Sequence, residues 1–245
     1  MNMEMKEKKF VVDESFVTLF PDAAIAILSV GGMKRAQDIG AHEADEIRAF
    51  LESANQEARR FLTSEVISEN RIPALWREAY KKFPTKKGAR CSIEALLKRV
   101  LHGNPVPSIT PTVDITNGIS LKYGFPIGAE NVDAFEGDLH LGVMKGGEAF
   151  WPLGSDKEEP PLPGEVAYYD RAGVVCRCFN WRDGQRTAVT DHTVNELIIM
   201  ECIEPERMEE LKMAMEELAG LLSQYTGARI RAKGVVTAGN REVFI

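Results

Sequence analysis

The strongest constraint on the fold is a change in hydrophobic periodicity near residue 128. Before it, apolar residues recur every three or four positions, the spacing that places them on one face of an α-helix. After it, apolar and polar residues alternate in short runs between turn residues, as in half-buried strands. This order predicts an α+β protein of one domain, whose helical N-terminal half packs around a central antiparallel or mixed sheet.

The pattern predicts helices over residues 41–62, 73–82, 92–101, 110–123 and 204–225. It predicts strands over residues 9–12, 23–30, 139–144, 148–153, 165–169, 174–181, 194–202 and 228–236. Because Lys145-Gly146-Gly147 is a turn sequence, the strands before and after it are expected to pair as a hairpin. Alternation along 174–181 places Arg177 and Phe179 on one face of their strand.

The helix at 110–123 has clear start and stop signals. Thr110 can cap it, Pro111 suits its first turn, and Gly124 ends it. Asp114 and Asn117 share a face of this helix. Two compatible roles follow: the pair braces the neighbouring loop, or it shapes a pocket at the helix C-terminus.

Composition is that of an ordinary soluble protein. The 245 residues are 44% hydrophobic and 27% charged, with a net charge of −7. The N-terminus has no secretory signal pattern, and no apolar run is long enough to cross a membrane. The four cysteines lack C-x-x-C spacing, which favours reduced thiols in the cytoplasm. Cys176 and Cys178 are expected to pack in the core, so no metal site is predicted.

The acidic net charge counts against extensive phosphate binding, since such binding depends on Lys and Arg. The basic residues are clustered, however. One cluster lies between Arg77 and Arg90, and another comprises Arg229, Arg231 and Lys233. Either the protein has one basic face or these side chains are simply solvated.

Familiar catalytic and nucleotide-binding motifs are absent from the sequence, and no cofactor is predicted. The densest polar run is Asn180-Trp181-Arg182-Asp183. Trp offers a stacking surface and Arg a planar fork for carboxylate or phosphate, which suits a recognition rim. A structural Arg–Asp pair at a turn is the alternative. Glu201 ends an apolar strand, so its carboxylate either reaches solvent or enters a pocket.

The run VDITNGISLKYGFPIGAENVD, which follows Thr112, resembles the signature of the B3/B4 editing module in the β-subunit of phenylalanyl-tRNA synthetase. The similarity extends over about residues 72–203. It implies one B3/B4-like domain over 1–245, with a strand–helix extension before this core and a helix–strand extension after it.

In that family the module hydrolyses tyrosine wrongly attached to its tRNA. The resemblance implies that Glu201 accepts the tyrosine hydroxyl and that the loop 180–184 lies beside it. It matches Ala232 to a small residue of the family site. Where the family carries a histidine, this chain has Gly128.

Two main functions are therefore predicted. The first is a free-standing aminoacyl-tRNA deacylase that acts on the tRNA 3′ end. Asn180, Arg182 and Asp183 would position the ester or water, and the substrate would be bound by Asp114, Asn117, Gly128, Trp181, Glu201 and Ala232. The second is a non-catalytic module that binds RNA or a small amino-acid-like ligand. A different hydrolase or a lyase on the same scaffold is a third possibility. A complete synthetase is excluded, because no ATP-binding signature is present.

Overall fold

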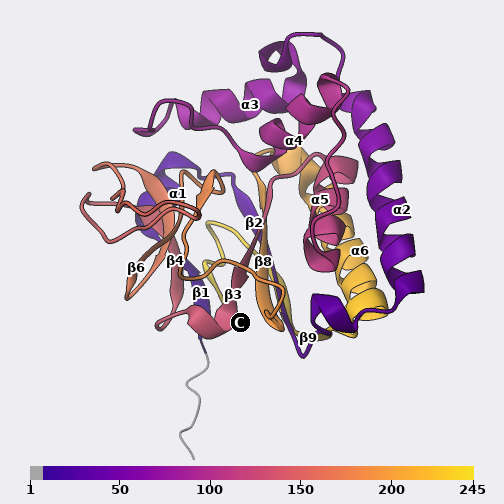
Figure 1. The fold of residues 1–245 in the computed structure, drawn as a ribbon. Helices are drawn as coiled ribbons and strands as arrows, with labels where there is room; N and C mark the ends of the chain where they lie inside the picture. The colour runs from indigo at the N-terminus through magenta and orange to yellow at the C-terminus, as the bar shows by residue number, and fades with distance from the viewer. Residues whose placement is uncertain (1–7) are drawn as a thin grey trace, which may run out of the picture.

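The computed structural model describes residues 8–245 and confirms the α+β class (Figure 1). Its strands form two sheets within one domain, and helices cover one side and one end of the sheet pair. The sequence predicts one central sheet, whereas the structure divides the strands between two. This division creates an interior layer between the sheets, which the sequence pattern does not reveal.

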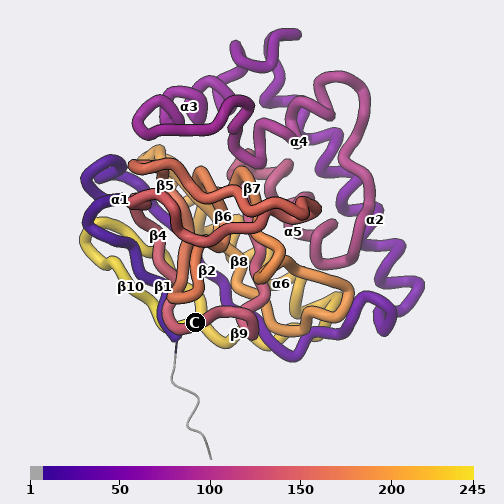
Figure 2. Tube along the Cα trace, turned by 60° about the vertical axis from the view of Figure 1, so that its left-hand side comes forward, coloured from indigo at the N-terminus to yellow at the C-terminus, as the bar shows by residue number. Residues whose placement is uncertain are grey.

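The six-stranded sheet has the order β10-β1-β4-β5-β6-β7 (Figure 2). Its strands are β1 (Lys9–Val12), β4 (Leu139–Val143), β5 (Val166–Asp170), β6 (Gly173–Arg177), β7 (Arg182–Asp183) and β10 (Glu242–Phe244). It is mixed, because β1 and β4 are parallel and the other pairs are antiparallel.

The four-stranded sheet has the order β3-β8-β2-β9 and is antiparallel throughout. Its strands are β2 (Ala24–Gly31), β3 (Ile127–Asn131), β8 (Asn195–Cys202) and β9 (Arg229–Val236). Every residue of β2 is buried, which explains its unbroken apolar sequence: a central strand covered on both faces does not alternate.

The helices are α1 (Glu14–Leu19), α2 (Ala41–Glu57), α3 (Arg71–Tyr80), α4 (Ser92–Leu101), α5 (Pro111–Tyr123) and α6 (Met208–Thr226). The five helices that the periodicity predicts are all present. The sixth, α1, is one and a half turns long, too short to give a periodic signal. Along residues 8–245 no helix combines the length and apolar character needed to cross a membrane.

Two apolar cores lie on either side of the four-stranded sheet. One fills the space between the two sheets and continues under α3 and α4. The other lies between the four-stranded sheet and the helices α2, α5 and α6. Side chains alternate between these cores along β8: Leu197 and Ile199 join the first, and Ile198 and Met200 the second. We call the first core the sheet–sheet layer and the second the sheet–helix layer.

The predicted hairpin between residues 139–144 and 148–153 is wrong. β4 pairs instead with β5, after a long intervening loop. Within the turn, the Glu148 carboxylate accepts hydrogen bonds from the backbone N–H groups of Lys145 and Gly146, at 2.8 and 2.9 Å. These bonds take the place of strand pairing, and the chain leaves the sheet.

The predicted strand over 174–181 is also too long. β6 ends at Arg177, because Cys178 and Phe179 both adopt positive φ values, 50° and 63°. A positive φ strains the backbone of a residue other than glycine. Burial offsets it here: the Phe179 ring is fully buried, and its centroid lies 5.2–6.0 Å from those of Phe16, Phe20, Trp76 and Phe83. The strict alternation expected beyond Arg177 therefore does not occur.

Candidate functional site

Glu201 lies inside the sheet–sheet layer, and only 1% of its surface is exposed. Of the two positions that the sequence leaves open, the structure shows the buried one. Its Oε1 accepts a hydrogen bond of 2.8 Å from the hydroxyl of Tyr168 on β5. Its Oε2 accepts one from the side-chain amide of Asn180. Both carboxylate oxygens are thus bonded to other parts of the same chain.

Asn180 connects Glu201 to the start of α4. While its Nδ2 donates to Glu201, its Oδ1 accepts a 3.0 Å hydrogen bond from the backbone N–H of Ser92. Ser92 is the first residue of α4, where backbone N–H groups have no partner within the helix. The side chain therefore ties together β8, α4 and the strained turn at Cys178–Phe179.

Gly128 faces the same layer. It pairs with Ile199 on β8, and a Cβ placed on it would have the Asn180 Cβ, 3.9 Å away, as its nearest neighbour. The position thus has room for a side chain. We call Gly128, Tyr168, Asn180 and Glu201 the Glu201 site.

Burial controls the electrostatics of this site. Desolvation raises the pKa of Glu201 to about 8, although the hydrogen bonds from Tyr168 and Asn180 oppose the rise. The carboxyl group is therefore mostly protonated at neutral pH. Desolvation also raises the pKa values of the neighbouring thiols Cys91, Cys176 and Cys178. These cysteines are neutral thiols near pH 7, so they are poor nucleophiles.

The remaining residues of the polar run lie at the edge of the site. Trp181 is half-buried and packs against the sheet–sheet core. Arg182 and Asp183 form the short strand β7 and are exposed. Asp183 turns one oxygen inward, 3.2 Å from the Sγ of Cys176.

Asp114 acts on a neighbouring loop and not on the Glu201 site. It is buried, accepts a 2.7 Å hydrogen bond from the backbone N–H of Ile109, and also bonds the hydroxyl of Ser108. Thr110 occupies the N-cap position of α5 without a capping hydrogen bond from its side chain, contrary to the predicted cap. Asn117 is half-buried one turn further along α5.

Ala232 is separated from Glu201 by the sheet geometry. It pairs with Ser29 on β2, whereas Glu201 pairs with Ile25, four residues along the same strand. Four residues of a strand span about 13 Å. The β9 residue level with Glu201 is Val236. The structure thus brings Gly128, Asn180 and Glu201 together but leaves Ala232 and Asp114 outside that group.

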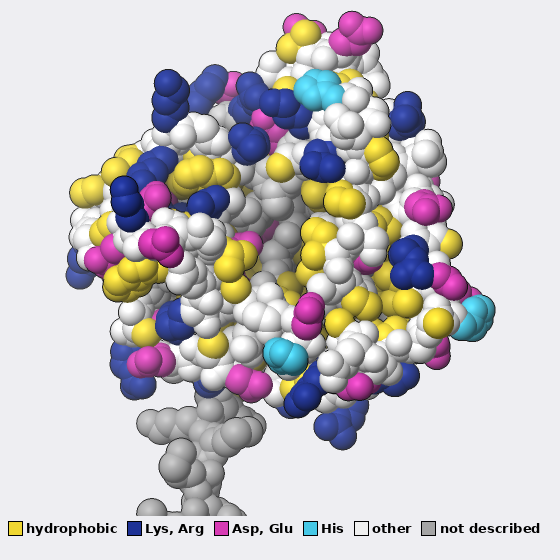
Figure 3. Space-filling view, in the orientation of Figure 1, with side chains coloured by type: hydrophobic (Ala, Val, Ile, Leu, Met, Phe, Trp, Pro, Cys, Tyr) yellow, Lys and Arg dark blue, Asp and Glu magenta, His cyan; other side chains and the backbone are white. Residues whose placement is uncertain are grey.

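A basic cavity adjoins the Glu201 site. It has a volume of about 370 Å³ and lies between α3, α4 and the loop that connects them. Its wall includes the cations Arg77, Lys81, Arg90 and Lys98, together with Trp76, Tyr80 and Cys91. In Figure 3 the surface is hollowed between the strand side and the helix side, and Lys and Arg gather along the upper rim, where Figure 1 places α3 and α4.

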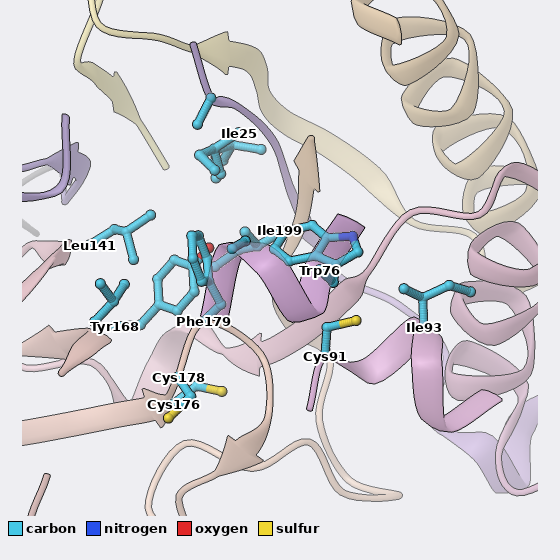
Figure 4. Close-up of a cluster of buried hydrophobic side chains, with 14 of the residues drawn as sticks. Ile25, Trp76, Cys91, Ile93, Leu141, Tyr168, Cys176, Cys178, Phe179 and Ile199 are labelled. Carbon is cyan, nitrogen blue, oxygen red and sulfur yellow. The ribbon is translucent and has the colours of Figure 1, made fainter. Parts of the chain in front are cut away.

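The cavity and the Glu201 site share a wall. Tyr80, which lines the cavity, donates a 2.6 Å hydrogen bond to the carbonyl of Cys178, two residues before Asn180. Cys91, which also lines the cavity, directly precedes Ser92, and the backbone N–H of Ser92 donates a hydrogen bond to Asn180. In Figure 4, Trp76 and Cys91 lie on the side of Ile93, and Tyr168 and Phe179 lie on the side of Leu141.

Sequence reasoning missed Tyr168, whose hydroxyl donates a hydrogen bond to the Oε1 of Glu201. It lies in the run VAYYD, where two adjacent tyrosines give no indication of which one points inward. The assembly of two sheets decides this: Tyr168 is buried in the layer, whereas the hydroxyl of Tyr169 bonds Asp13 at 2.6 Å on the other face.

The model of the family described as "B3/4 domain" matches residues 75–227. This chain belongs to that family. Among solved structures, it is similar to an N-terminal fragment of the phenylalanyl-tRNA synthetase β-subunit from Pyrococcus horikoshii, with a TM-score of 0.50 and 14% identity. The match covers 94% of this chain and 52% of that one. No curated protein matches the sequence. The predicted resemblance is thus confirmed as family membership and shared fold.

Proposed function

We propose that this B3/4 domain binds the aminoacylated 3′ end of a tRNA and hydrolyses the ester between the amino acid and the ribose. The observation that carries the proposal is the basic cavity, which shares a wall with a buried, hydrogen-bonded carboxyl group. Its volume lies within the range of small-ligand sites, and its cations match a phosphate-bearing partner.

Two of the cavity's cations are free to contact phosphate. Arg77 is committed to Glu94, which is 2% exposed and accepts hydrogen bonds of 2.6–3.2 Å from its guanidinium. Lys81 pairs with Glu78 on the surface. Arg90 and Lys98, by contrast, form no ion pair with any residue in 8–245. We assign phosphate contact to this second pair.

In the reaction, water attacks the ester carbonyl carbon, the bond to the ribose oxygen breaks, and that oxygen receives a proton from the water. The thiols near the site are protonated, so a cysteine nucleophile is disfavoured. Positioning of the ester and of water supplies the rate. Asn180 and Asp183 are the positioning residues in this proposal, with Arg182 at the exposed rim and the open space at Gly128 beside them.

The saturated hydrogen bonding of Glu201 favours a second candidate, a module that binds without hydrolysis. A substrate hydroxyl can reach Oε1 only if the Tyr168 hydroxyl is displaced. A buried acceptor that is already paired loses the discrimination that an unpaired one would give. Binding of RNA or of an amino-acid-like ligand would then be the whole activity, and the acidic net charge favours the small ligand.

A panel of mischarged tRNAs separates these candidates. Release of the amino acid by the wild-type protein supports the deacylase, and binding without release supports the module. Tyr168→Phe frees one oxygen of Glu201, so we expect it to raise the rate on tyrosyl-tRNA relative to phenylalanyl-tRNA. Glu201→Gln in the Tyr168→Phe background should reverse that preference. Equal rates on both tRNAs in all three proteins would contradict a role for Glu201 in selection.

Salt dependence tests the phosphate contacts. Arg90→Glu with Lys98→Glu should weaken tRNA binding and flatten the slope of log K against log[salt] by about 1.4 to 1.8, the share of two phosphate contacts. The matched control is Arg229→Glu with Lys212→Glu, which makes the same charge change on β9 and α6, where both residues are exposed. An equal effect of both double variants would refute a local phosphate site.

A further inference from the structure

Three ligand-type side chains converge at the edge of the sheet–sheet layer: Glu130 of β3, Cys176 of β6 and Asp183 of β7. One donor atom from each lies within 4.8 Å of the other two. The Sγ of Cys176 and the Oδ1 of Asp183 are 3.2 Å apart. We call this group the carboxylate–thiol cluster. Sequence spacing gives no sign of it, because its members come from three separate strands.

Two members of the cluster are buried, and polar atoms at or beside Glu130 lack hydrogen-bond partners in the described residues. Glu130 and Cys176 are each 4% exposed. By strict hydrogen-bond geometry, the Oε2 of Glu130 has no partner within residues 8–245, and neither does the hydroxyl of the fully buried Thr187, although Thr187 lies near enough to lower the pKa of Glu130. An unpaired buried carboxylate oxygen costs about 1–3 kcal/mol or more. A bound cation would remove that cost.

The spacing suits a tetrahedral ion. With metal–sulfur and metal–oxygen bonds of about 2.3 and 2.1 Å, neighbouring ligand atoms lie about 3.6 Å apart. The observed 3.2 Å and the upper limit of 4.8 Å bracket this value. The supports are rigid: Cys176 and Asp183 are directly paired across β6 and β7, and Glu130 pairs with Leu197 on β8 and bridges to Ala188.

We propose that Glu130, Cys176 and Asp183 bind one divalent ion of the zinc class, with a fourth coordination position open to solvent. One thiolate and two carboxylates select Zn²⁺ or Co²⁺ over Mg²⁺ or Ca²⁺, which take oxygen ligands. Asp183 turns one carboxylate oxygen inward while the residue as a whole is exposed, so the cluster lies next to solvent at this position. Three protein ligands with an open position are the arrangement of reactive zinc sites. The inference shares Asp183 with the proposed tRNA activity, but its test measures ion binding alone.

Cobalt titration of the metal-free protein tests the site. Co²⁺ bound to a thiolate gives a charge-transfer band in the near ultraviolet, so the wild-type protein should develop this band up to one equivalent. Cys176→Ser should abolish it. Glu130→Gln and Asp183→Asn, which keep the side-chain shape, should weaken Co²⁺ binding at least tenfold. The matched control is Cys202→Ser, a buried cysteine on the opposite face of β8.

Zinc should displace cobalt with loss of the band. No band in the wild-type protein, or a band that survives Cys176→Ser, would overturn the proposal. So would a band that Cys202→Ser removes as fully as Cys176→Ser does. Because the wild-type titration needs no variant, a folding failure of any variant leaves the decisive measurement intact.

Discussion

The two faces of the four-stranded sheet differ in chemistry. The sheet–sheet layer contains Tyr168, Asn180 and Glu201, joined by hydrogen bonds, with Glu130 and Cys176 nearby. The core of the sheet–helix layer is formed by apolar side chains of the sheet and of α2, α5 and α6. Its buried acid is Glu196 of β8, five residues before Glu201 and on the opposite face. Both of its oxygens lack a hydrogen-bond partner in the part of the chain that the structure describes.

Buried side chains therefore have different roles on the two faces of the four-stranded sheet. Between sheet and helices, burial mainly serves packing, and the buried acid Glu196 lies near Thr112, at the end of the sheet beside α5. Between the sheets, burial surrounds a connected polar group and raises its pKa values together. Such clusters are typical of functional sites, although structural networks also produce them. The proposed function uses one face of a single sheet, and the difference between the two faces can be tested from both of them.

The largest expected effect is on the pH dependence of stability. The pKa of Glu201 is raised from 4.5 to about 8, so the folded state holds a proton that the unfolded state releases between these values. Stability therefore falls as pH rises from about 4.5 to about 8. Glu201→Gln removes this contribution, which amounts to about 5 kcal/mol at most, at 1.36 kcal/mol per pKa unit. Urea unfolding at pH 5 and pH 9 measures it.

Glu196→Gln is the matched variant on the other face. Desolvation raises the pKa of Glu196 to about 7, so its contribution is lost over a lower window, from about 4.5 to about 7. We expect Glu196→Gln to gain stability relative to wild type by pH 7, whereas Glu201→Gln continues to gain up to pH 8. Identical pH profiles of the two variants would contradict the distinction between the faces.

The next effect concerns two buried asparagines. Asn180→Ala leaves the Ser92 N–H and one oxygen of Glu201 unpaired, and we expect a loss of about 3 kcal/mol in the free energy of unfolding. Asn55→Ala on α2 breaks three hydrogen bonds, to Leu51 and Val106, whereas Asn180→Ala breaks two. Both substitutions should lower the free energy of unfolding by a similar amount, and chemical denaturation measures this loss.

Only Asn180→Ala should change the titration of Glu201. Its amide lowers the pKa of that carboxyl, so its removal should raise the pKa further and steepen the loss of stability towards pH 8. A pH profile unchanged in Asn180→Ala would mean that the hydrogen bond contributes nothing to the state of Glu201.

The smallest effect compares two glycines. A Cβ on Gly118 of α5 would lie 2.3 Å from the Phe50 ring, so Gly118→Ala should cost about 1–2 kcal/mol even after the gain in helix propensity. Gly128, facing the sheet–sheet layer, has its nearest neighbour at 3.9 Å. Gly128→Ala should stay within about 0.5 kcal/mol of wild type. Thermal unfolding measures both, and a large loss in Gly128→Ala would show that the space is filled.

Much of the fold could be predicted from local patterns. The five predicted helices and the strands at residues 9–12, 24–31, 195–202 and 229–236 agree closely with the sequence. The hairpin after β4 failed because Glu148 satisfies the turn with its own carboxylate. The strand after Arg177 failed because Phe179 gains more from its aromatic neighbours than its backbone loses in strain.

The sequence by itself determined the α+β class, the helix positions and the family resemblance, and this resemblance predicted that the loop at Asn180 lies beside Glu201. Only the tertiary structure decided that the Tyr168 hydroxyl donates a hydrogen bond to Glu201. It also placed Ala232 four residues along the sheet from Glu201 and brought Glu130, Cys176 and Asp183 together. The physical reason is that periodicity reports which face of an element is buried. Periodicity does not report which second element covers that face. The choice of covering element decides which polar groups become neighbours.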